Sequence, residues 1–216
     1  MKLTFSKVVN IVFYKVLNVI PYFHFIKGTR NTQCPIRFRE WFMQKVIGFN
    51  KNCYWPVHFS SIVTYPERVY VGIDTNPGYS NSCNIHAING VYVDDYTQIA
   101  SGVGIQSGNH SVYDNRKQID SKPIRIGKYC WLGQNAIILP SVELGDFTIV
   151  GAGAVVSKSF KEGYCVIGGV PAKKIRDLDP NECVRFENEV KYNGYLRNES
   201  FPKFAGVKLD IFNVRD

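Results

Sequence analysis

The sequence predicts an all-β fold, a parallel β-helix, and three observations support the prediction. An aliphatic residue recurs every six positions, small or β-branched residues recur two positions before it, and one long interruption breaks the rhythm. An α-helix needs apolar residues at a period near 3.6, and a half-buried strand needs strict alternation, so neither explains a period of six. A coil that turns a corner every six residues explains it, because each hexapeptide supplies a short strand and a tight turn.

The rhythm is clearest from residue 91 to residue 156. Its aliphatic positions are Val93, Ile99 and Ile105, then Ile126, Leu132, Ile138, Leu144, Val150 and Val156. The accompanying small or β-branched positions are Val91, Thr97, Val103, Ile124, Cys130, Ala136, Val142, Thr148 and Ala154. We expect three hexapeptides to form one triangular turn of eighteen residues, with the aliphatic side chains stacked in columns inside it.

The rhythm predicts irregularities as well. It extends weakly backwards through Val71, Tyr65, Phe59, Cys53 and Ile47, which suggests irregular first turns. Residues 72–90 are four residues out of phase, which predicts a bulge or small loop. From Ile105 to Ile126 is 21 residues, one hexapeptide plus fifteen, and this interval contains "SGNHSVYDNRKQIDSKP". Excursions of this length are usually functional or disordered, so we expect a protruding loop over residues 106–125.

The two ends lie outside the repeat, and we place the β-helix domain at residues 47–178. Residues 1–46 read as a basic, amphipathic helical segment: residues 1–51 hold nine Lys or Arg against the single acidic Glu40. Polar residues interrupt its apolar stretch too early for a spanning helix, and we expect no signal peptide. The segment either packs on the domain or a neighbouring subunit, or contacts an anionic membrane through residues 1–30. Residues 179–216 predict a short helix over 179–192 and a tail.

Composition narrows the classes of function. The net charge of +8 comes entirely from the apolar N-terminal segment, not from a basic face with stacking aromatic residues, so nucleic-acid binding is disfavoured. Six cysteines form no CxxC pair and no cluster with zinc-site spacing. Free thiols suit a reducing cytosol, so we expect a cytoplasmic protein. The alternative location is the inner face of the membrane.

Three further stretches carry a resemblance to a known family. They are "SGNH" followed by "KPIRIGKYCWLGQNAIILPSVELGD", the run "IVGAGAVVSKSF", and the closing "VIGGVPAKKIRDL". Over residues 47–178 the chain resembles the hexapeptide-repeat acyltransferases, which include galactoside and maltose acetyltransferases and polysaccharide O-acetyltransferases. The resemblance implies a left-handed coil, a homotrimer with active sites between subunits, and acetyl-CoA as the acyl donor, with no metal required.

The resemblance also assigns the acceptor side of the active site. Acyl transfer to a hydroxyl needs a base, and imidazole titrates near neutrality. Of His24, His58, His86 and His110, only His110 matches the family's catalytic position, and His86 reads as a packing or surface residue. Asn84 matches an acceptor-binding asparagine, although a buried turn asparagine is the alternative. The group that orients the base stays open among Asp94, Asp95 and Asp114.

The donor side follows from the same match. The backbone N–H of Gln134 is a candidate to stabilise the oxyanion of the tetrahedral intermediate. Coenzyme A positions match Ala152, Ser157, Lys158, Lys173 and Arg176. Small residues let the pantetheine arm lie close to the backbone, and cations neutralise the nucleotide phosphates.

We therefore expect an O-acetyltransferase that acts on a sugar hydroxyl of a bacterial surface polysaccharide or its precursor. "TYPERVYVG" resembles that branch of the family. Three alternatives stay open: an N-acetyltransferase acting on an amino sugar, a non-catalytic β-helix scaffold, and a zinc enzyme of the γ-carbonic anhydrase type. The last ranks low, because it needs three convergent histidines and only His86 and His110 could contribute.

Overall fold

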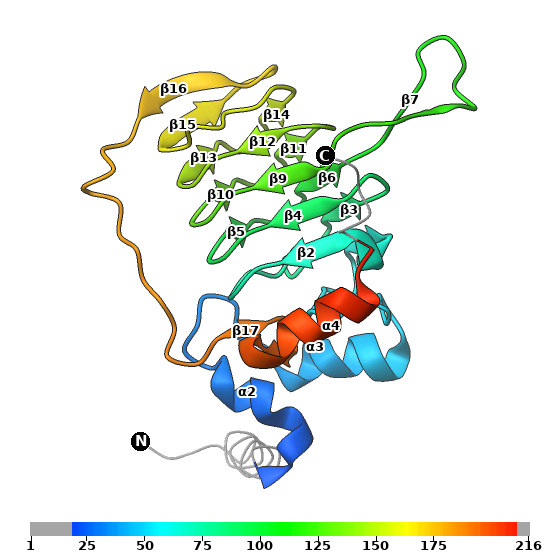
Figure 1. The fold of residues 1–216 in the computed structure, drawn as a ribbon, viewed down its shortest axis with the longest axis vertical. Helices are drawn as coiled ribbons and strands as arrows, with labels where there is room; N and C mark the ends of the chain where they lie inside the picture. The colour runs from blue at the N-terminus through cyan, green and yellow to red at the C-terminus, as the bar shows by residue number, and fades with distance from the viewer. Residues whose placement is uncertain (1–18, 211–216) are drawn as a thin grey trace, which may run out of the picture.

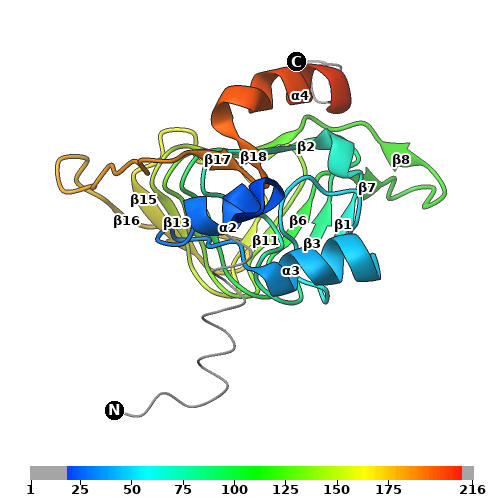
Figure 2. The same cartoon turned by 90° about the horizontal axis from the view of Figure 1, so that it is seen from below.

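The structure, a computed structural model, describes residues 19–210. Most of them wind into a triangular coil, which Figure 1 shows from the side and Figure 2 shows from below. Its walls are three sheets of parallel strands, which we call faces A, B and C. Face A comprises β1 (Ile62–Thr64), β3 (Asn84–His86), β6 (Gly104–Gln106), β11 (Ile137–Ile138) and β14 (Val155–Val156). Face B comprises β2 (Val69–Val71), β4 (Val91–Val93), β9 (Ile124–Ile126) and β12 (Glu143–Leu144). Face C comprises β5 (Gln98–Ile99), β10 (Trp131–Leu132), β13 (Thr148–Val150), β15 (Cys165–Gly168) and the antiparallel β16 (Lys173–Asp177).

Strand register confirms the six-residue rhythm. In the regular turns Trp131 pairs with Ile149 and Ile137 with Val155, so each turn takes eighteen residues. The aliphatic set is buried except for the half-buried Ile99, and the small or β-branched set is buried throughout. These side chains fill the interior, and burying each aliphatic one contributes on the order of 1.5–3 kcal/mol.

The lower turns are longer than eighteen residues, including the 20 residues from Asn84 to Gly104 on face A. Ile62 pairs with Asn84 and Val69 with Val91, a spacing of 22 residues, which confirms the four extra residues predicted between 72 and 90. Val91 pairs with Ile124, a spacing of 33 residues, so this turn carries the fifteen-residue excursion. The strands on either side of these insertions stay paired in register: β2 with β4, and β4 with β9.

The predicted phase of the first turns holds only in part. Cys53 and Val71 are buried as expected, whereas Ile47, Phe59 and Tyr65 are exposed at 55%, 48% and 38%. The corner at Tyr65 explains the shift. Tyr65 has a left-handed backbone (φ 58°) and leads into the 3-10 turn η3 (Pro66–Arg68), which lengthens this corner.

The amphipathic stretch predicted for the N-terminal segment falls mostly on residues 1–18, which lie outside the described range, and so does most of the predicted membrane contact. The described part forms two short helical stretches at the base of the coil. They are η1 (Pro21–Phe23) with α2 (His24–Gly28), and α3 (Phe38–Phe42) with η2 (Met43–Ile47). None of the helices between residues 19 and 210 has the length and apolarity that a bilayer span requires.

The helix predicted over residues 179–192 is also wrong. Residues 178–191, which we call the strap, run without a helix or a strand from β16 back down the coil to its base, as Figure 1 shows. The strap is hydrogen-bonded to the coil: the Tyr129 hydroxyl donates to the Phe186 carbonyl (2.9 Å), and the Asn188 N–H donates to the Tyr96 hydroxyl (3.1 Å). The C-terminal helix, α4 (Phe201–Lys208), comes later, after the hairpin β17 (Tyr192–Asn193) and β18 (Leu196–Arg197) and the 3-10 turn η4 (Asn198–Ser200).

Asp74 joins three parts of the chain at the base of the coil. Its buried carboxylate accepts the backbone N–H groups of Gln33 and Cys34 (both 3.1 Å) and the side-chain amide of Asn188 (2.9 Å). The N-terminal segment, the first turns and the strap are therefore fixed to one another by a single side chain.

Candidate active site

The fifteen-residue excursion forms a hairpin that projects from the coil where the chain passes from face A to face B (Figure 1). Its strands are β7 (Asn109–His110) and β8 (Gln118–Ile119), with His110 opposite Gln118. Its base is held firmly: the Ser107 hydroxyl donates to the His86 carbonyl (3.0 Å), and the Asn89 side-chain amide donates to the Ser107 carbonyl (2.9 Å). The hairpin therefore starts from a fixed point on face A.

His110 lies exposed on β7. Its backbone N–H donates to the side-chain oxygen of Asn109 (2.9 Å), and its imidazole has no hydrogen-bond partner within residues 19–210. The ring is thus free to meet a substrate or a second chain.

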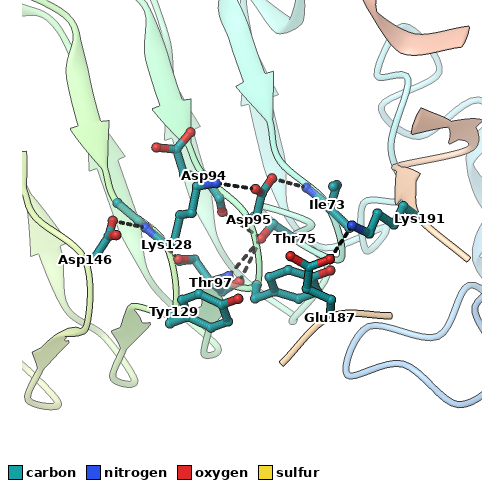
Figure 3. A network of polar contacts seen from close by, with 12 residues as sticks. Ile73, Thr75, Asp94, Asp95, Thr97, Lys128, Tyr129, Asp146, Glu187 and Lys191 are labelled. Atoms are coloured by element: carbon teal, nitrogen blue, oxygen red, sulfur yellow. Dashed lines mark hydrogen bonds and ion pairs between the residues drawn. The ribbon is translucent and has the colours of Figure 1, made fainter. Parts of the chain in front are cut away.

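None of the three carboxylates considered as orienting groups contacts the His110 ring. Asp114 binds Arg116 in the hairpin turn (2.9 Å), and this hydrogen bond lowers the pKa of the Asp114 carboxyl. Asp94 and Asp95 lie at the corner between faces B and C, the B–C edge, with face B between them and the hairpin. Figure 3 shows Asp95 between Ile73, whose N–H it accepts (2.8 Å), and Lys128 (2.9 Å).

Asn84 is exposed on β3, where its side chain points outward from face A. Its neighbours in the register are Ile62 on one side and Gly104 on the other. The alternative of a buried turn asparagine is therefore wrong, since the residue lies in a strand and its side chain is open to solvent. The nearby Gln106 amide donates to the Asn84 carbonyl (3.2 Å), which leaves the Asn84 side chain available.

The donor-side residues flank the upper turns of face A. Gln134 and Ala152 are exposed, one above the other, at the corner between faces C and A, the C–A edge; the Gly153 N–H donates to the Gln134 carbonyl (2.8 Å). Ser157 and Lys158 are exposed at the A–B edge, the one from which the hairpin departs.

Lys173 and Arg176 lie exposed on β16, which closes the top of face C. The nearby Lys174 instead pairs with Asp177 (2.8 Å). An added Cβ at Gly133 would lie 2.7 Å from the Ala152 nitrogen, so the C–A edge is as flat as a close-lying thin chain requires. Small residues beside exposed cations fit coenzyme A, with a slender arm and charged phosphates.

Within one chain these residues do not converge on a single pocket. His110 and Lys158 share the A–B edge, whereas Gln134 and Ala152 occupy the opposite edge of the same face. A hollow of about 680 Å³ lies elsewhere, at the base between α2 and the strap. The same part of the chain contains no group of three or more His, Cys, Asp or Glu side chains placed to hold a metal ion.

One residue of this region was not selected from the sequence. This residue is His86, for which the sequence suggests only a packing or surface role. It points outward on β3 two positions after Asn84, and its ring lies beneath the base of the hairpin. Its spacing from Asn84 was the only available signal, because alternate residues of a strand share a face.

Residues 123–158, which form the regular turns above the hairpin, match the family described as bacterial transferase hexapeptide (six repeats). This stretch is a bacterial-transferase hexapeptide repeat. The hexapeptide coil resembles the galactoside O-acetyltransferase of Escherichia coli (strain K12), at 31% identity over 137 residues that cover 59% of this chain and 61% of the relative. It also resembles WbbJ of the same strain, provisionally named a lipopolysaccharide biosynthesis O-acetyl transferase, at 34% identity, covering 50% of this chain and 61% of the relative.

Solved structures show the same hexapeptide coil. A galactoside acetyltransferase in complex with coenzyme A superposes with a TM-score of 0.57 at 20% identity, covering 89% of this chain and 92% of the other. A maltose O-acetyltransferase from Clostridium difficile 630 gives 0.53 at 21% identity, covering 76% and 89%. These likenesses show the fold, a left-handed β-helix. The chain spans about three-fifths of the length of the curated relatives it matches.

Proposed function

We propose that the protein transfers an acetyl group from acetyl-CoA to a sugar hydroxyl of a bacterial surface polysaccharide or its precursor. The observation that carries the proposal is the hairpin. It projects from the edge that also bears Lys158 and presents His110, whose imidazole has no hydrogen-bond partner in residues 19–210. The names of two relatives support the acceptor class, since one is a galactoside O-acetyltransferase and the other is assigned provisionally to lipopolysaccharide biosynthesis.

The residues suggest roles for each step. His110 takes the proton of the acceptor hydroxyl as its oxygen attacks the thioester carbonyl. The new C–O bond gives a tetrahedral oxyanion, which the Gln134 N–H stabilises. The C–S bond then breaks, and the leaving thiolate receives the proton from the His110 imidazolium. Lys158, Lys173 and Arg176 hold the phosphates of the donor.

The placement of these groups favours a homotrimer with shared active sites. His110 and Gln134 lie on opposite edges of face A in one chain, so they act on the same carbonyl only when they come from different chains. We propose that the hairpin of one subunit meets the C–A edge of its neighbour.

The activity is tested by incubating the protein with acetyl-CoA and a panel of nucleotide sugars, oligosaccharides and methyl glycosides. Thiol release and the mass of the product are followed. Transfer to a hydroxyl supports the proposal. Turnover with amino sugars or amines alone would replace it with the N-acetyltransferase alternative, and no turnover with any acceptor would favour the scaffold.

His110→Ala should lower kcat by about 10²- to 10⁴-fold, the usual contribution of a general base. Its thermal unfolding should stay unchanged, because the ring is exposed and has no hydrogen-bond partner among the described residues. His58→Ala, which removes a histidine from the irregular first turns, serves as the control with near-normal turnover. Full activity of His110→Ala would mean that another group is the base.

Mixing two inactive variants tests the shared site. Ala152→Tyr places a bulky ring on the exposed C–A edge, where it should block the donor without disturbing the core. Ala152→Tyr and His110→Ala should each be inactive, and refolding them together should restore part of the activity. Light scattering of the native protein should give the mass of three chains. Failure of the mixture to recover activity would place both groups in one chain's site.

A further inference from the structure

His86 is held in a fixed orientation on face A. Its Nδ1 is hydrogen-bonded to the Thr64 hydroxyl at 2.7 Å, across the pair that joins β1 to β3. The Tyr65 ring approaches it edge-on, with ring centroids 5.6 Å apart. Fixing a half-buried imidazole through one nitrogen determines where the other nitrogen points.

The other nitrogen, Nε2, faces the base of the hairpin. A Cβ built on Gly108 would lie 3.7 Å from both Cδ2 and Nε2 of His86, and 2.3 Å from the Ile88 side chain. Glycine is therefore required at 108, and its missing side chain leaves the imidazole edge uncovered. His110 follows two residues after Gly108, so both imidazoles lie toward the A–B edge of face A.

The Nε2 atom is open and unused. It has no hydrogen-bond partner among the described residues. The fully buried side-chain atoms there that lack a partner are Glu40 Oε2 and Asn76 Oδ1, so His86 Nε2 is not fully buried. Because Thr64 occupies Nδ1, Nε2 keeps one hydrogen-bonding function: it accepts when Nδ1 carries the proton and donates when Nδ1 does not.

The surroundings indicate what this nitrogen binds. Asn84 and His86 project from the same side of β3, with Cα atoms about 7 Å apart, a spacing that suits two hydroxyls of one hexose ring. Further up, the outward residues of face A turn apolar, at Ile137 and Val155. Asn84, His86 and Gln106 therefore offer neutral polar groups to an acceptor, between the exposed Ile62 below and the apolar turns above.

We propose that His86 is an acceptor-binding residue, whose Nε2 hydrogen-bonds a sugar hydroxyl beside Asn84 while Thr64 holds the ring. This assignment rests on the proposed function and adds a second contact to the acceptor site. His86 thereby helps to determine which sugar is accepted. The hydroxyl bound by His86 and the hydroxyl bound by Asn84 must lie on the same side of the sugar.

Two substitutions distinguish the roles of the two ring nitrogens of His86. His86→Asn keeps a polar group near Nδ1 and removes the one at Nε2, whereas His86→Gln keeps a group near Nε2. We expect His86→Asn to raise the acceptor KM about five- to tenfold, the cost of one neutral hydrogen bond, with kcat and the acetyl-CoA KM within twofold of wild type. His86→Gln should keep most of the affinity. Thr64→Val, which leaves Nε2 in place but releases the ring, should raise the acceptor KM by less than His86→Asn does.

A matched control is available at the base of the coil. His58 also has its Nδ1 bonded to a hydroxyl, that of Ser60 (2.8 Å), so His58→Asn makes the same chemical change away from the hairpin and should leave the acceptor KM unchanged. Monodeoxy analogues of the best acceptor in the panel supply the second measurement. One analogue should bind equally to wild type and to His86→Asn, because it lacks the hydroxyl that Nε2 binds.

Each other outcome overturns the assignment. An unchanged acceptor KM in His86→Asn would exclude contact with the substrate. Equal losses in the Asn and Gln variants, with a lower melting temperature in both, would make His86 a packing residue under Gly108. Wild-type protein without turnover on any acceptor would overturn the proposed function itself, a result separate from the previous two.

Discussion

Asp94 and Asp95 are adjacent in sequence and differ in what surrounds their charges. Asp95 accepts the Ile73 N–H and pairs with Lys128, as Figure 3 shows. Asp94 is half-buried and has no such partner in the part of the chain that the structure describes. Burial raises the pKa of its carboxyl, and the charge of Asp95 raises it further. The nearby Lys128 and Arg125 oppose this rise, and Asp146 adds to it.

A carboxyl whose pKa is higher in the folded chain favours folding in its protonated form. Ionised Asp94 therefore costs stability, and the cost grows as pH rises from the ordinary carboxyl pKa, near 4, through the raised one. Asp94→Asn should raise the free energy of unfolding at pH 7, and the gain should shrink as the pH approaches 4. Urea denaturation at the two pH values measures this. An equal effect at both would show that charge is not the cause.

The candidate site residues differ in how well the sequence predicts them. The break in the rhythm marks the loop that carries His110, and the family resemblance selects His110 within it. Asn84 was predicted to bind the acceptor, and the structure shows its side chain exposed on a strand. The setting of His86 could not be predicted, because its contacts with Thr64 and Gly108 depend on a 22-residue turn and on the close approach of the hairpin base. Neither follows from a period of six.

The hairpin is an insertion into a corner that closes without one in the turns above. Ile138 and Leu144 flank the equivalent corner at the normal six-residue spacing, and the chain there turns through residues 139–142. The excursion is therefore an addition to the coil, which already has a complete way of making this turn.

Deleting residues 108–122 should leave a folded coil. The deletion joins Ser107 to Pro123 and restores the six-residue spacing between Ile105 and Ile126. Since it shortens a loop and removes only exposed or half-buried residues, the melting temperature should change by a few degrees at most, while acetyl transfer is lost. Circular dichroism and the thiol-release assay measure the two effects. Unfolding of the variant would show that the hairpin supports the coil.

The elements outside the repeat were predicted less well, and the reason is visible in the strap. Its composition suits a helix, but Phe186 packs on Tyr96 and Tyr129 and Arg185 lies over Phe147, so contacts with the coil override local propensity. The rings beneath are stacked, Tyr129 on Tyr96 at 5.3 Å and on Phe147 at 4.8 Å. This column of rings exists only once the turns are aligned, so no local sequence pattern predicts its partner.

The strap connects the top of the molecule to its base, and the hydroxyl of Tyr129 is one of its attachments. Tyr129→Phe keeps the stacked ring and removes the hydrogen bond to Phe186, a loss of about 1 kcal/mol. Amide hydrogen exchange over residues 184–190 should speed up while exchange in the strands of the coil stays the same. Tyr113→Phe, which changes a fully exposed ring in the hairpin, is the control. Faster exchange throughout the coil would show that the strap and the coil open together.

Closure of the base from the C-terminal side has a consequence for biosynthesis. Phe201 packs on Tyr54, the Tyr195 N–H donates to the Tyr54 carbonyl, and Asn188 completes the bonding of Asp74. The first turns that the ribosome makes are thus covered by residues that emerge only after the whole coil. A growing chain can wind turn upon turn in order of synthesis, as solenoids do, but its first turns stay open at the base until translation has passed Phe201.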